Sequence, residues 1–291
     1  MVPRNKVGYA IFDGRMMGPS AKDSMLARWQ LGSMDELWKK PRERLGVNER
    51  MKKKAWAFVP EPMKDKVFGY AVRKGLGRFG EVRRIFDYDR HLLPNRYLGE
   101  LESRSPDLET AVKLTGLSIG YPAWNLLYYA LLCSIPTTDA VVVETGTNHG
   151  FSTIVMAQAL KDAGSHEKVW TVDIDPEVVP RAKANVEKAG LSEYVEFSVG
   201  DSIAFLKEFA DAHDHIDFAF LDGNHELDHV VNEFEVIHDG IAACLGKVYF
   251  DNTMSGGVAD ALRRIQDTHG GNLVRFDNCS WSPPGNAIWQ P

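Results

Sequence analysis

Apolar positions follow two different spacings from about residue 137 onward. Short runs rich in β-branched residues, typical of buried strands, alternate with stretches in which apolar residues recur at helical spacing. The pattern predicts strands at residues 140–145, 169–174, 195–199, 216–221, 247–251, 273–276 and 287–289. It predicts helices at 151–163, 177–189, 202–210, 225–238 and 257–268. Strands that alternate with helices indicate βαβ units and a parallel sheet.

The number and spacing of these elements predict an α/β fold. Seven strands with five interleaved helices fit one doubly wound, Rossmann-like domain over residues 121–291, in which the seven-stranded sheet is mainly parallel. Only residues 277–286 separate the last two strands, which is too short for a helical crossover, so an antiparallel terminal hairpin is expected at the sheet edge. A helix over residues 122–134 is expected to pack on the sheet just before the first strand.

The first 120 residues show less regular periodicity. Proline and glycine residues divide them into short helical pieces, which predicts a mostly helical N-terminal extension that either caps the site or mediates homo-oligomer formation. The charge also changes: residues 1–120 contain 24 Lys and Arg against 15 Asp and Glu, whereas the remainder contains 10 against 25. The basic clusters of the first region either meet an anionic group on a substrate or form solvated helix faces.

The composition is that of a globular protein, with 44% hydrophobic and 25% charged residues among 291. The most apolar stretch, 121–135, contains Asn125 and is shorter than the roughly 20 residues of a membrane-spanning helix, so we expect no membrane span and a cytoplasmic location. Three widely spaced cysteines argue against a disulfide scaffold or a thiolate zinc site. Because no recognisable nucleic-acid-binding module accompanies the basic clusters, we expect no nucleic-acid partner.

Residues 141–150 predict a cofactor site. An apolar strand ends at Glu144, turns on Gly146 and Gly150, and leads directly into an apolar helix, which leaves backbone N–H groups facing a ligand. Dinucleotide fingerprints place a middle glycine where this chain has Asn148, so pyrophosphate binding is disfavoured. The segment resembles motif I of the class I S-adenosylmethionine (SAM)-dependent methyltransferases, in which this loop holds the methionine part of the cofactor. The terminal hairpin is also a feature of that methyltransferase fold.

Acidic residues at the ends of successive predicted strands complete the predicted SAM site, because ligands of open parallel sheets bind beyond the carboxyl ends of the strands. Asp173 ends the second strand and is suited to the ribose hydroxyls, and Asp201 with Ser202 follows the third and is suited to the adenine amino edge. Helix capping is the alternative interpretation of Asp201. The predicted cofactor-binding residues are Glu144, Gly146, Thr147, His149, Gly150, Asp173, Asp201, Ser202 and Asp222.

The fourth and fifth strand ends predict a metal site. Asp222 follows one strand, and Asp251 with Asn252 ends the next, which gives an all-oxygen ligand set suited to Mg²⁺ or another hard divalent cation. The set resembles the metal-dependent O-methyltransferases of the catechol O-methyltransferase type, whose metal ligands match Asp222, Asp251 and Asn252. Alternatively, Asp222 caps the helix that begins near Asn224, and Asp251 with Asn252 forms a simple turn.

His225 is the predicted catalytic base. Three residues after the first metal aspartate, catechol enzymes place a lysine, whereas this chain has His225. The Asp-Gly-x-His form looks more like the macrocin-type O-methyltransferases, in which a histidine at this position serves as base. This resemblance favours a vicinal hydroxyl pair on a sugar or another natural product over a catechol. An imidazole is a competent base at neutral pH, especially where a metal acidifies the hydroxyl.

Together these features predict a Mg²⁺-assisted, SAM-dependent O-methyltransferase that acts on a small molecule. A metal-independent SAM methyltransferase, an NAD-dependent oxidoreductase and a SAM-fold binding module without catalysis are the alternatives. The walls of the acceptor pocket are expected to include tryptophans of the N-terminal region or of the terminal hairpin, namely Trp29, Trp38, Trp56 or Trp281.

Overall fold

A computed structural model describes residues 10–12, 15–17, 95–104, 114–115, 123–135, 139–253, 255–276 and 285–291. The chain divides into two compact units, Met1–Arg73 and Lys74–Pro291. In its described residues, the first unit contains strand β1 (Ala10–Phe12) paired antiparallel with β2 (Arg15–Met17).

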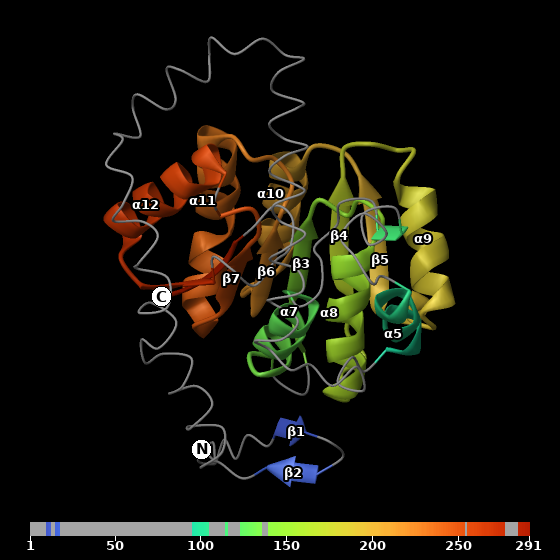
Figure 1. Ribbon diagram of the computed structural model, residues 1–291. Coiled ribbons are helices and arrows are strands. Elements are labelled where there is room, and N and C mark those ends of the chain that lie inside the picture. The colour runs from blue at the N-terminus through green and yellow to red at the C-terminus, as the bar shows by residue number, and fades with distance from the viewer. Residues whose placement is uncertain are drawn as a thin grey trace, which may run out of the picture. The chain divides into compact units, whose positions relative to one another are not determined.

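The second unit contains a seven-stranded sheet with helices on both faces (Figure 1). Its strands are β3 (Val142–Thr145), β4 (Val169–Asp173), β5 (Val195–Val199), β6 (Phe218–Leu221), β7 (Lys247–Phe250), β8 (Asn272–Phe276) and β9 (Asn286–Gln290). Its helices are α5 (Arg96–Ser103), α7 (Ala123–Leu132), α8 (Phe151–Asp162), α9 (Val179–Lys188), α10 (Ser202–Ala212), α11 (Leu227–Cys244) and α12 (Gly256–His269), with a 3-10 turn η2 (Ser192–Tyr194).

The topology of the sheet confirms the predicted fold class. The strand order is β5-β4-β3-β6-β7-β9-β8, in which β3 to β7 are mutually parallel and β9 is antiparallel to both β7 and β8. All seven predicted strands are present with bounds within two residues of those expected. The order reverses beside β3, with β4 on one side and β6 on the other, so the switch point of the doubly wound sheet lies at the predicted cofactor strand.

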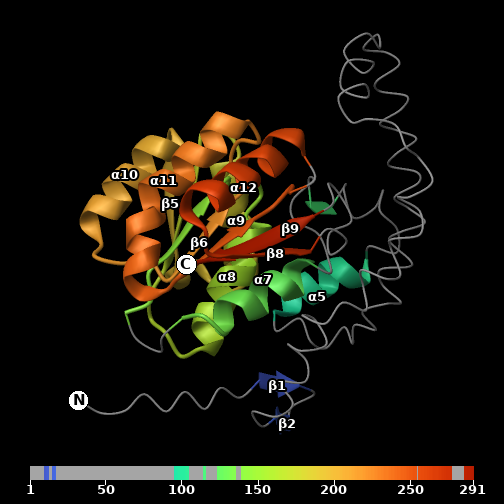
Figure 2. The same cartoon turned by 90° about the vertical axis from the view of Figure 1, so that its left-hand side faces the viewer.

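Alternate strand residues pack into two separate cores, one on each face of the sheet. Val142 and Phe220 lie in the core formed with α5, α7, α8 and α9, whereas their neighbours Val143 and Leu221 lie in the core formed with α10, α11 and α12. Figure 2 shows these helices on opposite sides of the sheet. Strands that are buried on both faces are apolar throughout, which is why the sequence shows them as continuous apolar runs.

Helix α11 is the main departure from the predicted helix bounds. The predicted helix ends at residue 238, but α11 continues through the following Asp-Gly pair to Cys244. A β-carbon on Gly240 would lie 3.2 Å from Ile216 Cγ1, so the glycine permits close packing of the helix on the chain just before β6.

Residues before the sheet take part in the second unit. The helix expected over 122–134 is present as α7, and α5 buries Leu98 and Leu101 in the same core. Most of residues 1–120, Trp281 and the three tryptophans proposed for the acceptor pocket lie outside the described residues, so the domain boundary at 120 stays a prediction. Within the part of the chain that the structure describes, no helix is long and apolar enough to span a bilayer.

Candidate functional site

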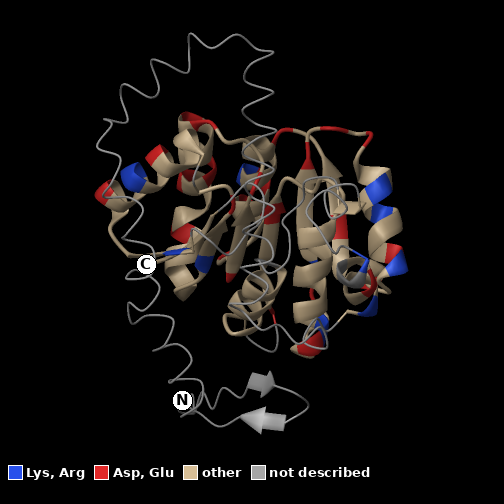
Figure 3. Cartoon of the chain, viewed as in Figure 1, with Lys and Arg blue, Asp and Glu red and all other residues tan. Residues whose placement is uncertain are grey.

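The predicted site residues gather at the carboxyl edge of the parallel sheet. Leu221 and Phe250 are register partners in β6 and β7, so Asp222 and Asp251, the residues that follow them, emerge side by side. Thr145 of β3 pairs with Leu221 on its other side, which places the glycine loop next to Asp222. The acidic loop that joins the end of β4 to α9 is visible at the top of Figure 3.

The glycine loop between β3 and α8 is held by the neighbouring strand β4. The N–H groups of Gly146 and Thr147 donate to Val172 O at 2.9 and 3.2 Å, and Thr147 Oγ1 lies 2.6 Å from Thr171 Oγ1 in the interior. Gly146 and Gly150 have φ values of 86° and 79°, which glycine adopts without strain. Thr147 is fully buried, so a direct contact of its side chain with a cofactor stays a prediction.

Glu144 lies inside the fold beneath this loop. Its carboxylate is fully buried and accepts hydrogen bonds from the hydroxyl groups of Ser152 and Thr153 in the first turn of α8. Burial raises the pKa of Glu144 to about 7, while the hydroxyl donors oppose the rise. The side chain therefore ties β3 to α8, and a direct contact with a cofactor stays a prediction.

Asp173 and Asp201 both organise backbone near the loop. Asp173 Oδ2 accepts from the N–H of Asn148 at 2.7 Å, which joins the end of β4 to the glycine loop. Asp201 caps α10 by accepting from Ala204 N at 2.9 Å, as the alternative interpretation predicted. Ser202 Oγ lies 3.0 Å from His229 Nε2. The roles of these residues toward ribose and adenine stay predictions.

His149 lies in the glycine loop and contacts α9. Its Nε2 is 2.9 Å from Arg181 Nη1, and the Asn185 side chain donates to its backbone carbonyl at 2.9 Å. Burial and the Arg181 charge lower the pKa of His149, so the neutral imidazole is favoured. Because a guanidinium only donates, Nε2 is the accepting nitrogen of the neutral ring.

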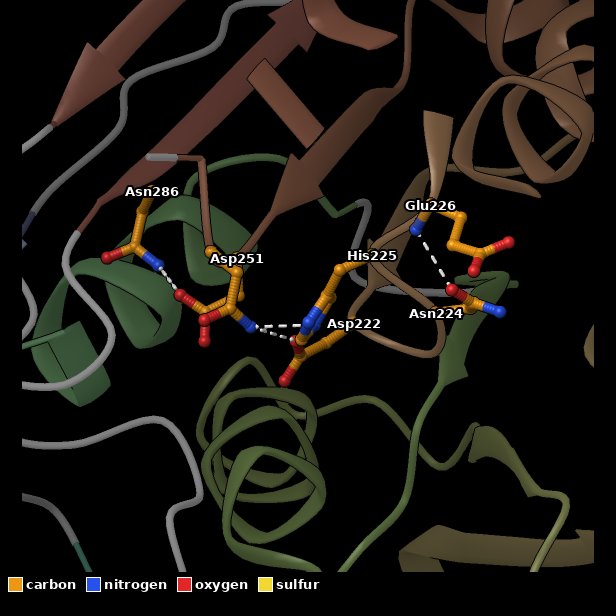
Figure 4. Close-up of polar contacts among 7 residues, drawn as sticks. Asp222, Asn224, His225, Glu226, Asp251 and Asn286 are labelled. Carbon is orange, nitrogen blue, oxygen red and sulfur yellow. Dashed lines mark hydrogen bonds and ion pairs between the residues drawn. The ribbon is translucent and has the colours of Figure 1, made fainter. Parts of the chain in front are cut away.

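Asp222, His225 and Asn252 form one hydrogen-bonded group across two strand ends. Figure 4 shows Asp222 and His225 side by side, with Asp251 nearby. Asn252 Nδ2 lies 2.8 Å from Asp222 Oδ1 and 2.9 Å from His225 Nε2, and the histidine nitrogen is 3.4 Å from the same carboxylate oxygen. Asp222 does not cap α11, because the N-cap of that helix is Glu226. The hydrogen bond to Asp222 raises the pKa of His225 despite its partial burial.

Asp251 is buried beside this group and points toward β9. Its Oδ1 accepts a hydrogen bond from Asn286 Nδ2, and its side chain is nearly inaccessible to solvent. Burial and the negative charge of Asp222 raise the pKa of Asp251 well above its ordinary value. The structure thus places the three predicted metal ligands at adjacent strand ends, as the sequence indicated.

The chemistry of this donor set fits a hard divalent cation. Burial raises the pKa of Asp222 as well as that of Asp251, so a bound positive charge would stabilise both carboxylates. Asn252 Oδ1 is buried without a hydrogen-bond partner, which leaves it available as a ligand. Among the described residues, no three His, Cys, Asp or Glu side chains cluster as metal ligands would; this set has a different composition, two carboxylates and one amide.

Two residues of the site were missed by the sequence analysis. Glu233 on α11 is 1% exposed, and its Oε1 lies 3.3 Å from His229 Nε2 and 3.1 Å from the position of a β-carbon on Gly223. The sequence does offer a sign of Glu233, because an acidic residue stands there at a position where the helical spacing otherwise places apolar residues. Asn286, the partner of Asp251, is fully buried in β9 and carries no comparable signal in its local sequence.

Comparisons with known proteins agree with this geometry. A family model described as a methyltransferase domain matches residues 143–252, which include the glycine loop, Asp222 and Asn252. Caffeoyl-CoA O-methyltransferase 1 of Nicotiana tabacum is 30% identical over 173 residues, which cover 56% of this chain and 69% of that relative. The catechol O-methyltransferase of Niastella koreensis is 34% identical over 70 residues, which cover 24% of this chain and 30% of that relative.

The extent of these similarities differs between relatives. With several curated relatives the alignment spans only 30% to 46% of the relative's length. Among solved structures, the O-methyltransferase from Bacillus cereus in complex with SAH is similar with a TM-score of 0.53 at 15% identity, over 75% of this chain and 99% of that chain. At this identity the structural likeness shows a shared fold.

Proposed function

The chain belongs to the class I SAM-dependent O-methyltransferases, and we propose that it transfers the methyl group of SAM to a hydroxyl group of a small molecule, with a divalent cation and His225 taking part. One observation carries this proposal. Asp222, His225 and Asn252 lie within hydrogen-bond distance of one another at the ends of β6 and β7, next to the glycine loop. The proposed cofactor site and the proposed acid-base site would therefore adjoin.

The cofactor side of the proposal rests on the loop after β3. SAM supplies an already activated methyl group, so the protein has to align the acceptor oxygen with the methyl carbon and sulfur and help remove a proton. The backbone around Gly146 and Gly150 would hold the methionine part, Asp173 the ribose and the Asp201–Ser202 pair the adenine. Glu144 would contribute by fixing the loop to α8 through Ser152.

The metal side rests on Asp222, Asp251 and Asn252, which would hold a Mg²⁺ ion. Such an ion would supply Lewis-acid chemistry, which lowers the pKa of an acceptor hydroxyl. Support comes from the two carboxyl groups whose pKa is raised by burial and from the unpartnered Asn252 Oδ1. A vicinal hydroxyl pair on a sugar or another natural product is the acceptor class that the Asp-Gly-x-His motif favours.

His225 would receive the proton of the attacking hydroxyl. Its side chain is 44% exposed, whereas that of Asp222 is 18% exposed, so the imidazole is accessible from the open side of the site. An amide nitrogen only donates, so the contact with Asn252 Nδ2 makes Nε2 the unprotonated nitrogen of the neutral ring, as a base requires. The Asp222 carboxylate, which lies 3.4 Å from the same nitrogen, accepts a hydrogen bond only from the protonated ring, so it stabilises the imidazolium that proton transfer forms.

Calorimetry on the full chain tests the cofactor assignment. S-adenosylhomocysteine, the product form of SAM, is expected to bind, and NAD is not. Binding of NAD without S-adenosylhomocysteine would show that the chain is an oxidoreductase and would overturn the proposal.

Methyl transfer from labelled SAM to a panel of sugar, polyketide and phenolic acceptors tests the chemistry. Activity is expected to disappear with a chelator and to return with Mg²⁺, and Mg²⁺ binding measured by calorimetry should weaken in Asp251→Asn. His225→Ala is expected to lose turnover with unchanged affinity for S-adenosylhomocysteine, while the exposed His166→Ala serves as its control. Full activity in the presence of chelator would instead indicate a metal-independent methyltransferase.

A further inference from the structure

The glycine loop contains a backbone segment that needs support from its surroundings. His149 lies between Asn148 and Gly150, which have φ values of 45° and 79°. Asparagine is one of the few non-glycine residues that adopt the left-handed region, and it does so with some backbone strain, so contacts from outside the loop help to stabilise this turn. One of them is the hydrogen bond from Asn185 Nδ2 to the backbone carbonyl oxygen of His149.

Asn185 belongs to the face of α9 that packs against the glycine loop. The β-carbon of Ala182 lies 3.1 Å from the position of a β-carbon on Gly150, so helix and loop are in close contact. Asn185 lies one turn further along and is 8% exposed. The amide of Asn185 has an acceptor oxygen as well as a donor nitrogen, so a partner for the oxygen helps to hold the nitrogen toward His149.

The partner of the Asn185 oxygen comes from α5. The Tyr97 hydroxyl donates to Asn185 Oδ1 at 2.9 Å, across 88 residues of sequence. This bond uses the amide oxygen and leaves Nδ2 directed at His149. Tyr97 is therefore linked to the loop backbone through a single side chain.

Helix α5 is itself fixed in place, so Tyr97 is presented in a defined position. Asn95 caps α5 by accepting from the N–H groups of Tyr97 and Leu98 at 3.0 and 3.4 Å. Its Nδ2 donates to Gln158 Oε1 on α8 at 2.9 Å and to Ala189 O at the end of α9 at 3.1 Å. One buried side chain thereby connects α5 to both helices that flank the glycine loop.

From these contacts we infer that Tyr97 is a positioning residue for SAM, which acts through Asn185 to hold His149 and the glycine loop in the conformation that binds the cofactor. The inference rests on the proposed function, because it assigns SAM to this loop. Tyr97 lies before residues 143–252, the part matched by the methyltransferase-domain family. The support of the cofactor loop would thus include α5, a segment outside the part of the chain that the family model matches.

The test compares two tyrosine variants by calorimetry with S-adenosylhomocysteine. Tyr97→Phe removes only the hydroxyl that contacts Asn185, and a hydrogen bond of ordinary strength predicts a rise in Kd of about threefold to tenfold. Tyr128→Phe is the matched control, because its hydroxyl also donates to a side chain, Asp162 Oδ2 at 2.7 Å, but at the far end of α8. Its Kd is expected to match that of the unsubstituted chain, although thermal unfolding shows a loss of stability in both variants.

A double-mutant cycle separates positioning from a general loss of packing. Asn185→Ala removes the link to His149, so the further change Tyr97→Phe is expected to leave the Kd of that variant unchanged. An unchanged Kd in the single Tyr97→Phe variant, or fully additive effects in the cycle, would overturn the inference while leaving the methyltransferase proposal intact. Failure of the unsubstituted chain to bind S-adenosylhomocysteine would overturn both.

Discussion

Gly146 packs directly against the backbone carbonyl of Asp222. A β-carbon at position 146 would collide with that carbonyl oxygen, and the φ of 86° is in the left-handed region that favours glycine. The contact joins the loop after β3 to the residue after β6. The predicted cofactor loop and the first predicted metal ligand are therefore mechanically coupled through one residue that has no side chain.

Gly146→Ala is expected to impair both halves of the site. The added methyl group has to displace the Asp222 backbone, so we expect affinity for S-adenosylhomocysteine to fall by about tenfold or more, which corresponds to ~1.4 kcal/mol. Gly164→Ala is the matched control, because Gly164 has a φ of 74° but no atom within 4 Å of the added β-carbon. It should lower the free energy of unfolding by about 1 kcal/mol through backbone strain alone. Equal affinities in the two variants, measured by calorimetry, would contradict the coupling.

Asn252 combines a backbone role with a side-chain role, and two substitutions separate them. Its φ is 56°, and its amide contacts both Asp222 and His225. Asn252→Gly and Asn252→Ala both remove the amide, so both are expected to lose Mg²⁺ affinity and turnover to a similar extent. Only the alanine variant strains the backbone, so its free energy of unfolding should be about 1 kcal/mol lower than that of the glycine variant.

Calorimetric titration with Mg²⁺, a turnover assay and urea unfolding distinguish these effects. Should Asn252→Gly keep the Mg²⁺ affinity and turnover of the unsubstituted chain, the amide is not part of the metal and base arrangement. An unfolding free energy that is equal in the two variants would show instead that the positive φ relaxes without cost.

The sequence predicted the sheet and its acidic edge because both depend on local signals. A strand that is buried on two faces is a continuous apolar run, and a polar residue directly after such a run, such as Asp222 or Asp251, marks its carboxyl end. Parallel neighbours bring those ends to the same edge, so the strand bounds were enough to predict that these side chains lie close together. Helix caps also depend on local sequence. An acid between a strand and a helix can therefore be read either as a cofactor contact or as a helix cap, and the sequence left both interpretations open for Asp201.

The contacts that the sequence did not predict depend on long-range packing. Asn286 reaches Asp251 because Ala287 of β9 pairs with Phe250 of β7, and that register is not encoded near either residue. Tyr97 reaches Asn185 for a similar reason, since the placement of α5 on α9 follows from packing in the shared core. Residues that support a site from a distance therefore require the structure.

Glu144 is expected to make the stability of the protein depend on pH. Its pKa rises from 4.5 to about 7 on burial, so the folded state binds this proton more tightly than the unfolded state. Stability therefore decreases as pH rises from about 4.5 through about 7. Glu144→Gln does not titrate, so its free energy of unfolding should improve relative to the unsubstituted chain by about 2.5 kcal/mol between pH 5 and pH 8.

Urea unfolding at four pH values across that range, without SAM or divalent cations, measures this difference. The exposed Glu187→Gln on α9 provides the control, and its difference from the unsubstituted chain should not change with pH in this way. A difference for Glu144→Gln that stays flat from pH 5 to pH 8 would mean that the buried carboxyl remains ionised throughout.

Asp217 offers a substitution that should reduce stability while leaving the site intact. It lies at the amino end of β6, on the opposite edge of the sheet from Asp222, and its Oδ2 accepts from the N–H of Val141 at 2.9 Å. Asp217→Ala leaves that N–H group without its side-chain partner, so we expect the free energy of unfolding to fall by about 1–3 kcal/mol. Asp217→Asn keeps an acceptor oxygen and should lose less, and the exposed Asp239→Ala should lose almost nothing. Urea unfolding ranks the three variants, and calorimetry should return one common affinity for S-adenosylhomocysteine. Weaker binding in Asp217→Ala under conditions in which it is fully folded would show that the two edges of the sheet are energetically coupled.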